Sequence, residues 1–262
     1  MHRLLVETSL LSEESPVLPK DAANHLKVLR PKTGEEVELF DGRGMWRIYR
    51  FCASLTSGRE TASPLRASTA ISVVPRPGRT LTLFACVTKG SRWDWTIEKA
   101  TELGVTRIVP VISDRTIVRI PKDERAAKRE RWQRIAEDAA RQSDAKWLPE
   151  ICEAVDFRDS IAFVRETTCF IGALTTPPSP PLISAVRRRL SQPIEQSNNP
   201  NNRTIEQFSL FVGPEGDFTP EELAALMEIA TPTSFGPTIL RAETAAIFAV
   251  SVLAAALGAR ES

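Results

Sequence analysis

The first third of the chain is built from short runs in which apolar and polar residues alternate. Residues 35–55, EEVELFDGRGMWRIYRFCASL, hold two such runs around Asp41-Gly42 and Gly44. Alternation with a period of two predicts strands, and an Asp-Gly pair between two runs predicts a β-hairpin. A further strand-like run at 65–74 leads into PRPG at 75–78, and such a Pro/Gly cluster is typical of a domain boundary.

After residue 78 the pattern changes to longer apolar runs separated by helical periods. The run TLTLFACVTKG, 80–90, is continuous and closed by a glycine, as in a parallel strand buried on both faces. A helix is expected over 92–104, with Gly104 at its C-terminal end. Strands alternating with helices predict an α/β domain with a parallel sheet and helices on both faces. The other expected elements are strands at 107–113, 167–174 and 208–213 and a charged helix at 123–142.

The pattern therefore predicts two domains, residues 1–74 and residues 75–262. Between the last two expected strands lies the segment 175–207, which is rich in Pro at one end and in Asn at the other. We expect an exposed and partly disordered insertion there, in which LISAVRRRL (182–190) could form a short helix.

Composition and charge narrow the class of protein. The longest apolar run, 245–257, is too short to cross a bilayer, and the N-terminal segment lacks the long apolar stretch of a signal peptide. The four cysteines show no zinc-binding spacing, so we expect reduced thiols in a cytoplasmic protein without membrane segment or metal. The formal net charge is +1, but residues 76–150 carry sixteen Lys/Arg and eleven Asp/Glu. That excess indicates either one basic face of the protein or a solvated, salt-bridged helix surface.

The segment GPEGDFTPEEL, 213–223, directly follows an expected buried strand. Thr219-Pro220-Glu221-Glu222 has the pattern of a capping box with proline at the first helical position, which predicts a helix start. Gly213 and Gly216 then lie in a turn at the carboxyl end of a parallel strand, where open α/β sheets bind ligands. Two glycines around a proline are also typical of a simple tight turn, and the spacing leaves both interpretations open.

The segment GPTILRAETA, 236–245, places two charges before a very apolar helix that is expected to end at Gly258. Glu243 falls in the first turn of that helix, where the helix dipole favours a carboxylate. Arg241 opposes the dipole, so we expect a partner for it: an anionic ligand, or one of the carboxylates of Glu243 and Glu215. The helix is apolar on nearly all sides, which predicts burial on several of them, including at a subunit interface.

Cations and aromatic side chains occur together in KGSRWDWTIEKATELG, residues 89–104. Basic residues beside aromatic rings suit nucleic acid, although the two tryptophans can equally belong to the core or to an interface. Histidine-centred catalysis is not expected, because His25 is the only histidine away from the N-terminus and falls in the other domain.

Five segments, in this order, resemble the bacterial ribosomal RNA small subunit methyltransferase E family of the SPOUT superfamily. Together the five segments cover most of the chain outside 175–207. They are NHLKVLRPKTGEEVELFDGRG, KGSRWDWTIEKATELGVTRIVPVISDRT, RWQRIAEDAARQ with LPEI after it, VGPEGDFTPEEL and FGPTILRAETAAIFAV.

The resemblance implies an N-terminal PUA-like β-barrel that binds RNA and a C-terminal SPOUT domain with a deep trefoil knot. It implies a homodimer that uses S-adenosyl-L-methionine to methylate N3 of one uridine in 16S rRNA of the small ribosomal subunit, uridine 1498 in the usual bacterial numbering. Carried over position by position, the cofactor-binding residues would be Leu174, Gly213, Pro214, Glu215, Gly216, Phe235, Gly236, Ile239, Leu240 and Arg241.

The catalytic residues implied are Arg241 and Glu243. Arg241 would face the cofactor carboxylate or the anion that develops at uracil N3, and Glu243 would orient Arg241 or accept a proton. RNA contacts are expected from the N-terminal domain and the basic middle of the chain: His25, Arg30, Lys89, Arg92, Lys99 and Gln142.

Three positions depart from the family pattern. Asp217 stands where a second glycine is usual in GPEGG, Thr238 stands where arginine is usual, and Ala145, followed by Lys146, stands where an arginine commonly follows the EQ motif. Aspartate tolerates turn geometry, whereas the other two changes remove cations. Two alternative functions stay open: methylation at another RNA position, and a catalytically silent RNA-binding factor in ribosome assembly.

Overall fold

The computed structural model describes residues 1–262 except 53–62, 165–166, 174, 176, 193–205 and 259–262. The chain divides into two compact units. Unit 1 comprises Met1–Arg76 and Ala140–Leu148, and unit 2 comprises Pro77–Ala139 and Pro149–Ser262. Among the described residues, no helix has the length and hydropathy needed to span a membrane.

Unit 1 is built on a five-stranded sheet in the order β1-β2-β3-β4, with β5 paired to β3. The predicted hairpin is confirmed: β2 and β3 are antiparallel, with Phe40 opposite Trp46 and Gly42 and Gly44 at positive φ in the turn. A short 3-10 helix and one α-helix complete the unit. The elements are β1 (His2–Leu5), the 3-10 helix Thr8–Ser12, α1 (Lys20–Leu29), β2 (Glu36–Phe40), β3 (Met45–Phe51), β4 (Leu65–Ala67) and β5 (Ser72–Val73).

Residues 140–148 belong to unit 1 because buried polar groups hold them there. Arg3 donates hydrogen bonds to the carbonyl oxygens of Ala140 and Ala145 at 2.6 and 3.1 Å, and it pairs with the buried carboxylate of Glu38 at 2.9 Å. Lys146 pairs with the same carboxylate at 2.6 Å and lies over the Trp46 ring. Lys146, which follows Ala145, is therefore engaged in contacts within unit 1.

Unit 2 contains a seven-stranded sheet in the order β12-β10-β11-β6-β7-β8, with β9 paired to β7, and every pairing is parallel. The predicted α/β fold with a parallel sheet is confirmed. The strands are β6 (Arg79–Cys86), β7 (Arg107–Ile112), β8 (Glu150–Ile151), β9 (Val155–Asp156), β10 (Thr168–Gly172), β11 (Glu206–Val212) and β12 (Thr231–Thr233).

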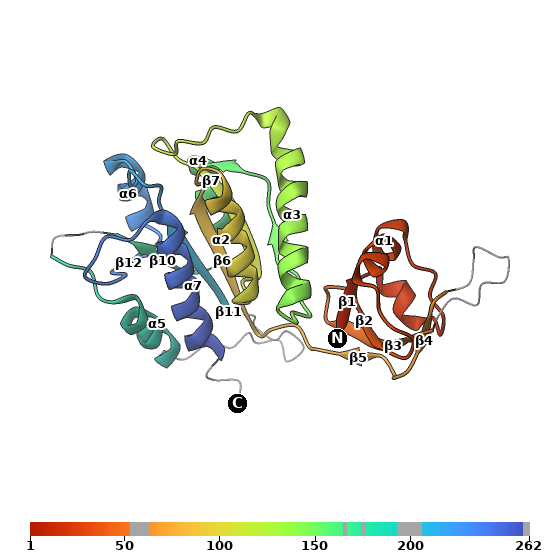
Figure 1. Ribbon diagram of the computed structural model, residues 1–262. Coiled ribbons are helices and arrows are strands. Elements are labelled where there is room, and N and C mark those ends of the chain that lie inside the picture. The colour runs from red at the N-terminus through yellow and green to blue at the C-terminus, as the bar shows by residue number, and fades with distance from the viewer. Residues whose placement is uncertain (53–62, 165–166, 174, 176, 193–205, 259–262) are drawn as a thin grey trace. The chain divides into compact units, whose positions relative to one another are not determined.

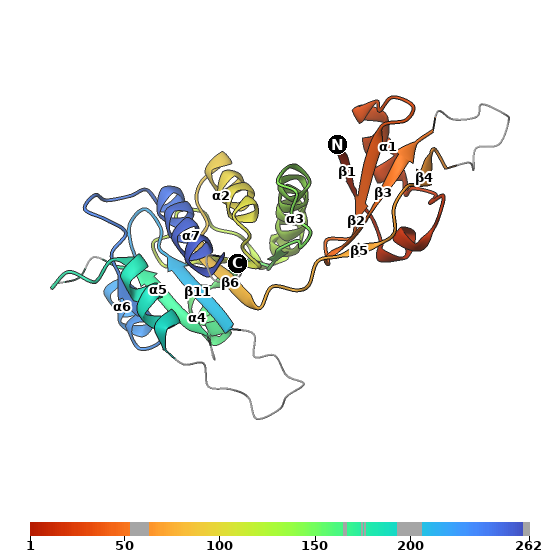
Figure 2. The same cartoon turned by 90° about the horizontal axis from the view of Figure 1, so that it is seen from below.

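Helices cover both faces of this sheet (Figures 1 and 2). On one face α7 contacts α2 and α5 and lies over β6 and β11, while α4 and α6 pack against the other face. The helices are α2 (Ser91–Glu102), α3 (Arg125–Gln142), α4 (Phe157–Ile161), α5 (Leu182–Ser191), α6 (Pro220–Met227) and α7 (Ala242–Gly258), with 3-10 turns at Lys122–Glu124 and Ala162–Val164.

The central strands are buried on both sides, as their continuous apolar sequences predict. Along β6, Leu83 belongs to the core under α7 and the neighbouring Phe84 belongs to the core under α6. The rings of Phe84 and Phe211 stack with centroids 4.5 Å apart, which ties β6 to β11 on the α6 side. The ends of these strands are thereby fixed, and the loops that follow them start from a rigid edge.

The short helix considered for 182–190 is confirmed as α5, but this part of the segment 175–207 is not an exposed insertion. Leu182, Val186 and Leu190 are buried and belong to the same core as α7. The reason is local: apolar residues at these spacings share one face of a helix, and burying that face outweighs the polar composition around it. The Asn-rich part, 193–205, lies outside the described residues.

Candidate functional site

The glycine-rich loop after β11 is held by the capping box that the sequence predicts. The Thr219 hydroxyl accepts from the amide of Glu222 at 3.2 Å, and the Glu222 carboxylate accepts from the amide of Thr219 at 3.0 Å. The second oxygen of Glu222 accepts from the amide of Asp114 in the loop after β7, at 2.9 Å. The start of α6 is thus tied both to its own first turn and to the neighbouring strand end.

Asp217 occupies a left-handed conformation in this loop, with φ of +59°. Its carboxylate accepts a hydrogen bond from the Phe218 amide at 2.8 Å, and its own amide donates to the carbonyl of Pro214 at 3.0 Å. Arg115 supports the loop from outside by donating to the carbonyl of Gly216 at 2.9 Å. Aspartate is therefore compatible with the conformation for which glycine is usual, as its tolerance of left-handed turns predicts.

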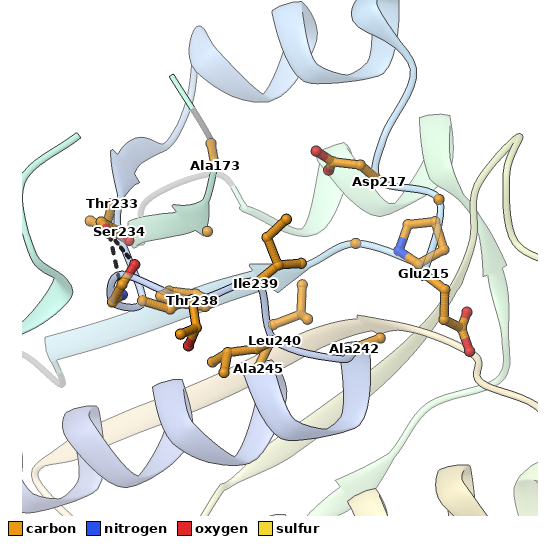
Figure 3. Close-up of a pocket in the computed structure, with 17 residues that line it drawn as sticks. Ala173, Glu215, Asp217, Thr233, Ser234, Thr238, Ile239, Leu240, Ala242 and Ala245 are labelled. Atoms are coloured by element: carbon orange, nitrogen blue, oxygen red, sulfur yellow. Dashed lines mark hydrogen bonds between the residues drawn. The ribbon is translucent and has the colours of Figure 1, made fainter. Parts of the chain in front are cut away.

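A second loop, between β12 and α7, faces the first. It turns at Gly236, whose φ of +126° is a conformation that L side chains rarely adopt. The Gly236 amide donates to the Ser234 hydroxyl at 3.2 Å, which closes the turn (Figure 3). The loop then reaches α7, where the Ala245 amide donates to the carbonyl of Arg241 as the helix begins.

The two loops enclose a pocket of about 370 Å³ at the carboxyl ends of β10, β11 and β12. Figure 3 shows it between the loops, with Ile239 reaching into it and the Glu215 carboxylate pointing away. Its volume and mixed lining suit a small molecule. The lining residues are Gly172, Ala173, Val212, Gly213, Pro214, Glu215, Gly216, Asp217, Thr233, Ser234, Phe235, Gly236, Thr238, Ile239, Leu240, Ala242 and Ala245.

Most of the residues expected to bind a cofactor line this pocket. Those brought together are Gly213, Pro214, Glu215, Gly216, Phe235, Gly236, Ile239 and Leu240, while Leu174 lies outside the described residues. Sequence reasoning missed the strand ends and the start of α7, where the lining residues are Gly172, Ala173, Val212, Thr233, Ser234, Ala242 and Ala245. Asp217 and Thr238, two of the positions that depart from the family pattern, also line the pocket. The sequence has no local signal for the contribution of β10 to the pocket. That contribution depends on β10 being the next strand in the sheet, which only the strand pairing reveals.

The two expected catalytic residues are placed differently from each other. Arg241 is exposed, does not line the pocket, and has no side-chain ion pair or hydrogen bond with any described residue. Glu243 is buried in the first turn of α7, one residue beyond the lining residue Ala242. Of the two kinds of partner considered for Arg241, the carboxylates of Glu243 and Glu215 are not paired with it in the described structure, and an anionic ligand stays a prediction. A different arginine, Arg92 of α2, contacts both carboxylates.

The residues expected to contact RNA fall into both units. In unit 1, His25 is half-buried on α1, while Arg30 after α1 and Gln142 at the end of α3 are exposed. In unit 2, Lys89 is exposed just before α2. Lys99 is paired with Glu98 and Glu102, both at 2.8 Å, and these carboxylates raise its pKa.

The two tryptophans of α2 have separate environments. Trp93 is buried and packs edge-on against Trp132 of α3, with ring centroids 5.6 Å apart, whereas Trp95 is 41% exposed. Phe248 on α7 is 40% exposed as well. One tryptophan thus belongs to the core, and the apolar groups left at the surface of these helices are available for contact with another molecule.

Comparisons with known proteins agree with this arrangement. Residues 75–254 match the RNA methyltransferase domain family, and residues 18–51 match the RNA methyltransferase PUA domain. Ribosomal RNA small subunit methyltransferase E of Synechocystis sp. is 31% identical over 259 residues, which are 98% of this chain and 78% of that protein. The chain belongs to the ribosomal RNA small subunit methyltransferase E family.

Solved structures that are similar over nearly the whole length of this chain support the same family assignment. The Neisseria gonorrhoeae ribosomal RNA small subunit methyltransferase E, bound to S-adenosyl methionine, is 27% identical with a TM-score of 0.73, over 97% of this chain and 96% of that one. A protein of Legionella pneumophila described as a methyltransferase, in complex with the same cofactor, is 26% identical with a TM-score of 0.75 at the same coverage. These comparisons confirm the family resemblance and the SPOUT and PUA-like folds, while the trefoil knot stays a prediction.

Proposed function

We propose that this protein transfers a methyl group from S-adenosyl-L-methionine to N3 of one uridine in 16S rRNA of the small ribosomal subunit. One observation carries the proposal. The two motifs for which the family resemblance implies cofactor binding, 213–216 and 235–241, are separated in the chain by α6 and β12, and residues of both line one pocket at the carboxyl edge of the sheet. The names of its relatives and the cofactor bound in two solved family structures support the same conclusion.

The residues of the pocket fit a molecule with an apolar ring, polar edges and positive charge. Ile239 and Leu240 offer apolar contacts for a planar base. Gly213 and Gly216 leave the backbone of the first loop accessible, and a Cβ at Gly213 would lie only 3.2 Å from the Phe218 ring. Asp217 also lines the pocket, and its negative charge would favour a positively charged ligand. The donor supplies an electrophilic methyl carbon on a sulfonium, so the protein has mainly to position the reactants.

The target nitrogen must lose its proton before it can attack. The N3–H electron pair would form the new bond to the methyl carbon while the carbon–sulfur bond of the sulfonium breaks and its electron pair returns to sulfur, leaving a neutral thioether, and the proton would pass to an acceptor in the protein. We assign that role to Glu243, because it is buried beside the pocket wall and one of its carboxylate oxygens has no hydrogen-bond partner among the described residues. Arg241, exposed at the start of α7, is free to move toward the anion that develops on the uracil ring.

RNA binding uses both units in this proposal. His25, Arg30 and Gln142 would contact RNA from unit 1, and Lys89 and Lys99 from unit 2. The N3 atom lies on the Watson–Crick edge, so the uridine must be unpaired or flipped out to reach the pocket. The homodimer and the cytoplasmic location belong to the proposal too, since both are implied by the family.

The decisive experiment is transfer of tritiated methyl groups to small ribosomal subunits from cells that lack this enzyme, followed by mass-spectrometric mapping of the modified nucleotide. Label at uridine N3 supports the proposal, and label at another position refutes it. The catalytically silent assembly factor is the second candidate, because Thr238 and Ala145 replace cations that are usual in the family. Absence of S-adenosylmethionine binding in calorimetry would favour that factor.

The role of Arg241 is tested with Arg241→Ala, which should lower methyl transfer far more than it lowers stability, because the exposed side chain has no partner to lose. Arg188→Ala is the matched control, since Arg188 is an exposed arginine on α5 outside the pocket. Turnover at the wild-type rate by folded Arg241→Ala would remove Arg241 from the mechanism.

A further inference from the structure

A single arginine connects the two walls of the pocket. Nη1 of Arg92, on α2, lies 3.4 Å from a carboxylate oxygen of Glu215 and 4.0 Å from one of Glu243. Glu215 belongs to the loop after β11 and lines the pocket, whereas Glu243 belongs to the first turn of α7. Among the described residues, Arg92 is the only cation within ion-pair distance of either carboxylate.

Glu243 needs this contact more than Glu215 does. Its side chain is 10% exposed, compared with 29% for Glu215, and a buried carboxylate without a nearby cation is costly. The oxygen near Arg92 is Oε1, while Oε2 is buried with no hydrogen-bond partner among the described residues. Buried acceptors normally have a partner, and this oxygen has none among the described residues, so it is available to a donor that arrives with a ligand.

We propose that Arg92 is a positioning residue for methyl transfer. It holds the Glu215 wall of the cofactor pocket against α7, and it orients Glu243 so that Oε2 can accept the proton from the target base. This inference rests on the function proposed above, and it assigns to Arg92 a task other than the RNA contact expected from the sequence.

The charges at this position argue against a phosphate contact. The three side chains carry formal charges of one positive and two negative, so the cluster as a whole does not attract RNA phosphate. A guanidinium has several N–H donors in a fixed plane, which lets one arginine serve carboxylates on two separate elements. Lysine has the same charge without that planar geometry and can only partly replace it.

The first measurement is S-adenosylmethionine binding by calorimetry together with kcat for methyl transfer to small subunits. Arg92→Ala should weaken cofactor binding about tenfold and lower kcat by roughly tenfold to a hundredfold, since misplacement by about 1 Å has effects of that size. Arg92→Lys should recover part of both losses. Arg107→Ala is the matched control. The side chain of Arg107 is 43% exposed, compared with 44% for Arg92, and it also pairs with a glutamate. Arg107 is the first residue of β7, so it lies at the amino ends of the strands, opposite the pocket.

The second measurement asks whether Arg92 acts through Glu243. The double-mutant cycle uses Arg92→Ala and Glu243→Gln. The fold loss of kcat in the double variant should be much smaller than the product of the two single fold losses, because Glu243→Gln then removes a carboxylate that Arg92→Ala has already displaced. Multiplicative effects would overturn the inference. A second outcome would also overturn the inference. In it, the cofactor affinity and kcat of Arg92→Ala stay within about twofold of wild type, while the slope of log RNA affinity against log salt concentration falls by about one, as expected for a lost phosphate contact.

Wild-type protein separates this inference from the function on which it rests. If the wild type transfers no methyl group to small subunits, the proposed function fails. If the wild type is active and Arg92→Ala is equally active, only the role of Arg92 fails. Should Arg92→Ala not fold, as judged by circular dichroism, the cycle is measured with Arg92→Lys instead, and multiplicative effects on kcat would again refute the coupling.

Discussion

Gly172, the last residue of β10, is a position where a single methyl group should disturb both the fold and the pocket. A Cβ there would lie 2.4 and 2.6 Å from Cε2 and Cζ of Phe235, whereas carbon atoms in ordinary contact are about 3.5–4.0 Å apart. Phe235 cannot move freely, because its ring packs against Phe248 with centroids 6.0 Å apart. Gly172→Ala therefore forces the ring or the strand end to shift by about 1 Å.

Overpacking of this kind costs about 1–3 kcal/mol. For a domain of this size each kcal/mol lowers Tm by about 2–4 °C, so Gly172→Ala should lower Tm by roughly 2–12 °C. Since Phe235 and Gly172 both line the pocket, the affinity for S-adenosylmethionine should fall as well. Tm is measured by circular dichroism and affinity by calorimetry.

Gly216→Ala is the matched control for stability. Gly216 also lines the pocket and has no positive φ, but a Cβ there would meet only side-chain carbons of Arg115, at 3.6 Å or more, which is ordinary contact. Its Tm should stay near that of the wild type. A second control, Gly172→Ala with Phe235→Leu, should recover stability without recovering cofactor affinity. Equal Tm values for the two alanine variants would refute the steric argument.

Three further predictions concern a helix cap, a buried ion pair and the cysteine thiols. Thr219→Ala removes the capping box of α6 and should cost about 1 kcal/mol in denaturant unfolding, whereas an unchanged midpoint would show that the cap adds nothing. Arg79→Met removes one partner of the buried Glu206 and should cost about 3 kcal/mol, the low end for a broken buried pair because a second arginine remains near that carboxylate. Burial raises the pKa of Cys86 to about 11, so its thiol should stay neutral and unreactive toward a thiol reagent at pH 8 and react only as the pH approaches 11. Half-exposed Cys52 should react first, and mass spectrometry of the labelled peptides checks the order.

Local signals in the sequence were sufficient for the elements that frame the site. The hairpin of unit 1 and the parallel strands of unit 2 followed from hydrophobic periodicity, and the start of α6 followed from its capping box. The position of the glycine loop at the carboxyl edge followed from its place directly after a buried strand. These features depend on neighbours a few residues apart, so the sequence alone contains the information.

The partners of charged groups were decided only by the tertiary structure. Arg92 and Glu215 are 123 residues apart, and Arg3 and Ala140 are 137 apart. Nothing local distinguishes Arg92 from Arg241 as the partner of Glu243, because ion pairing is non-specific in sequence and is set by which elements pack together. Hydrophobic periodicity thus determined the strands and helices of this protein. The packing of α2 against α7 determined that Arg92, and not Arg241, lies near Glu243 beside the pocket.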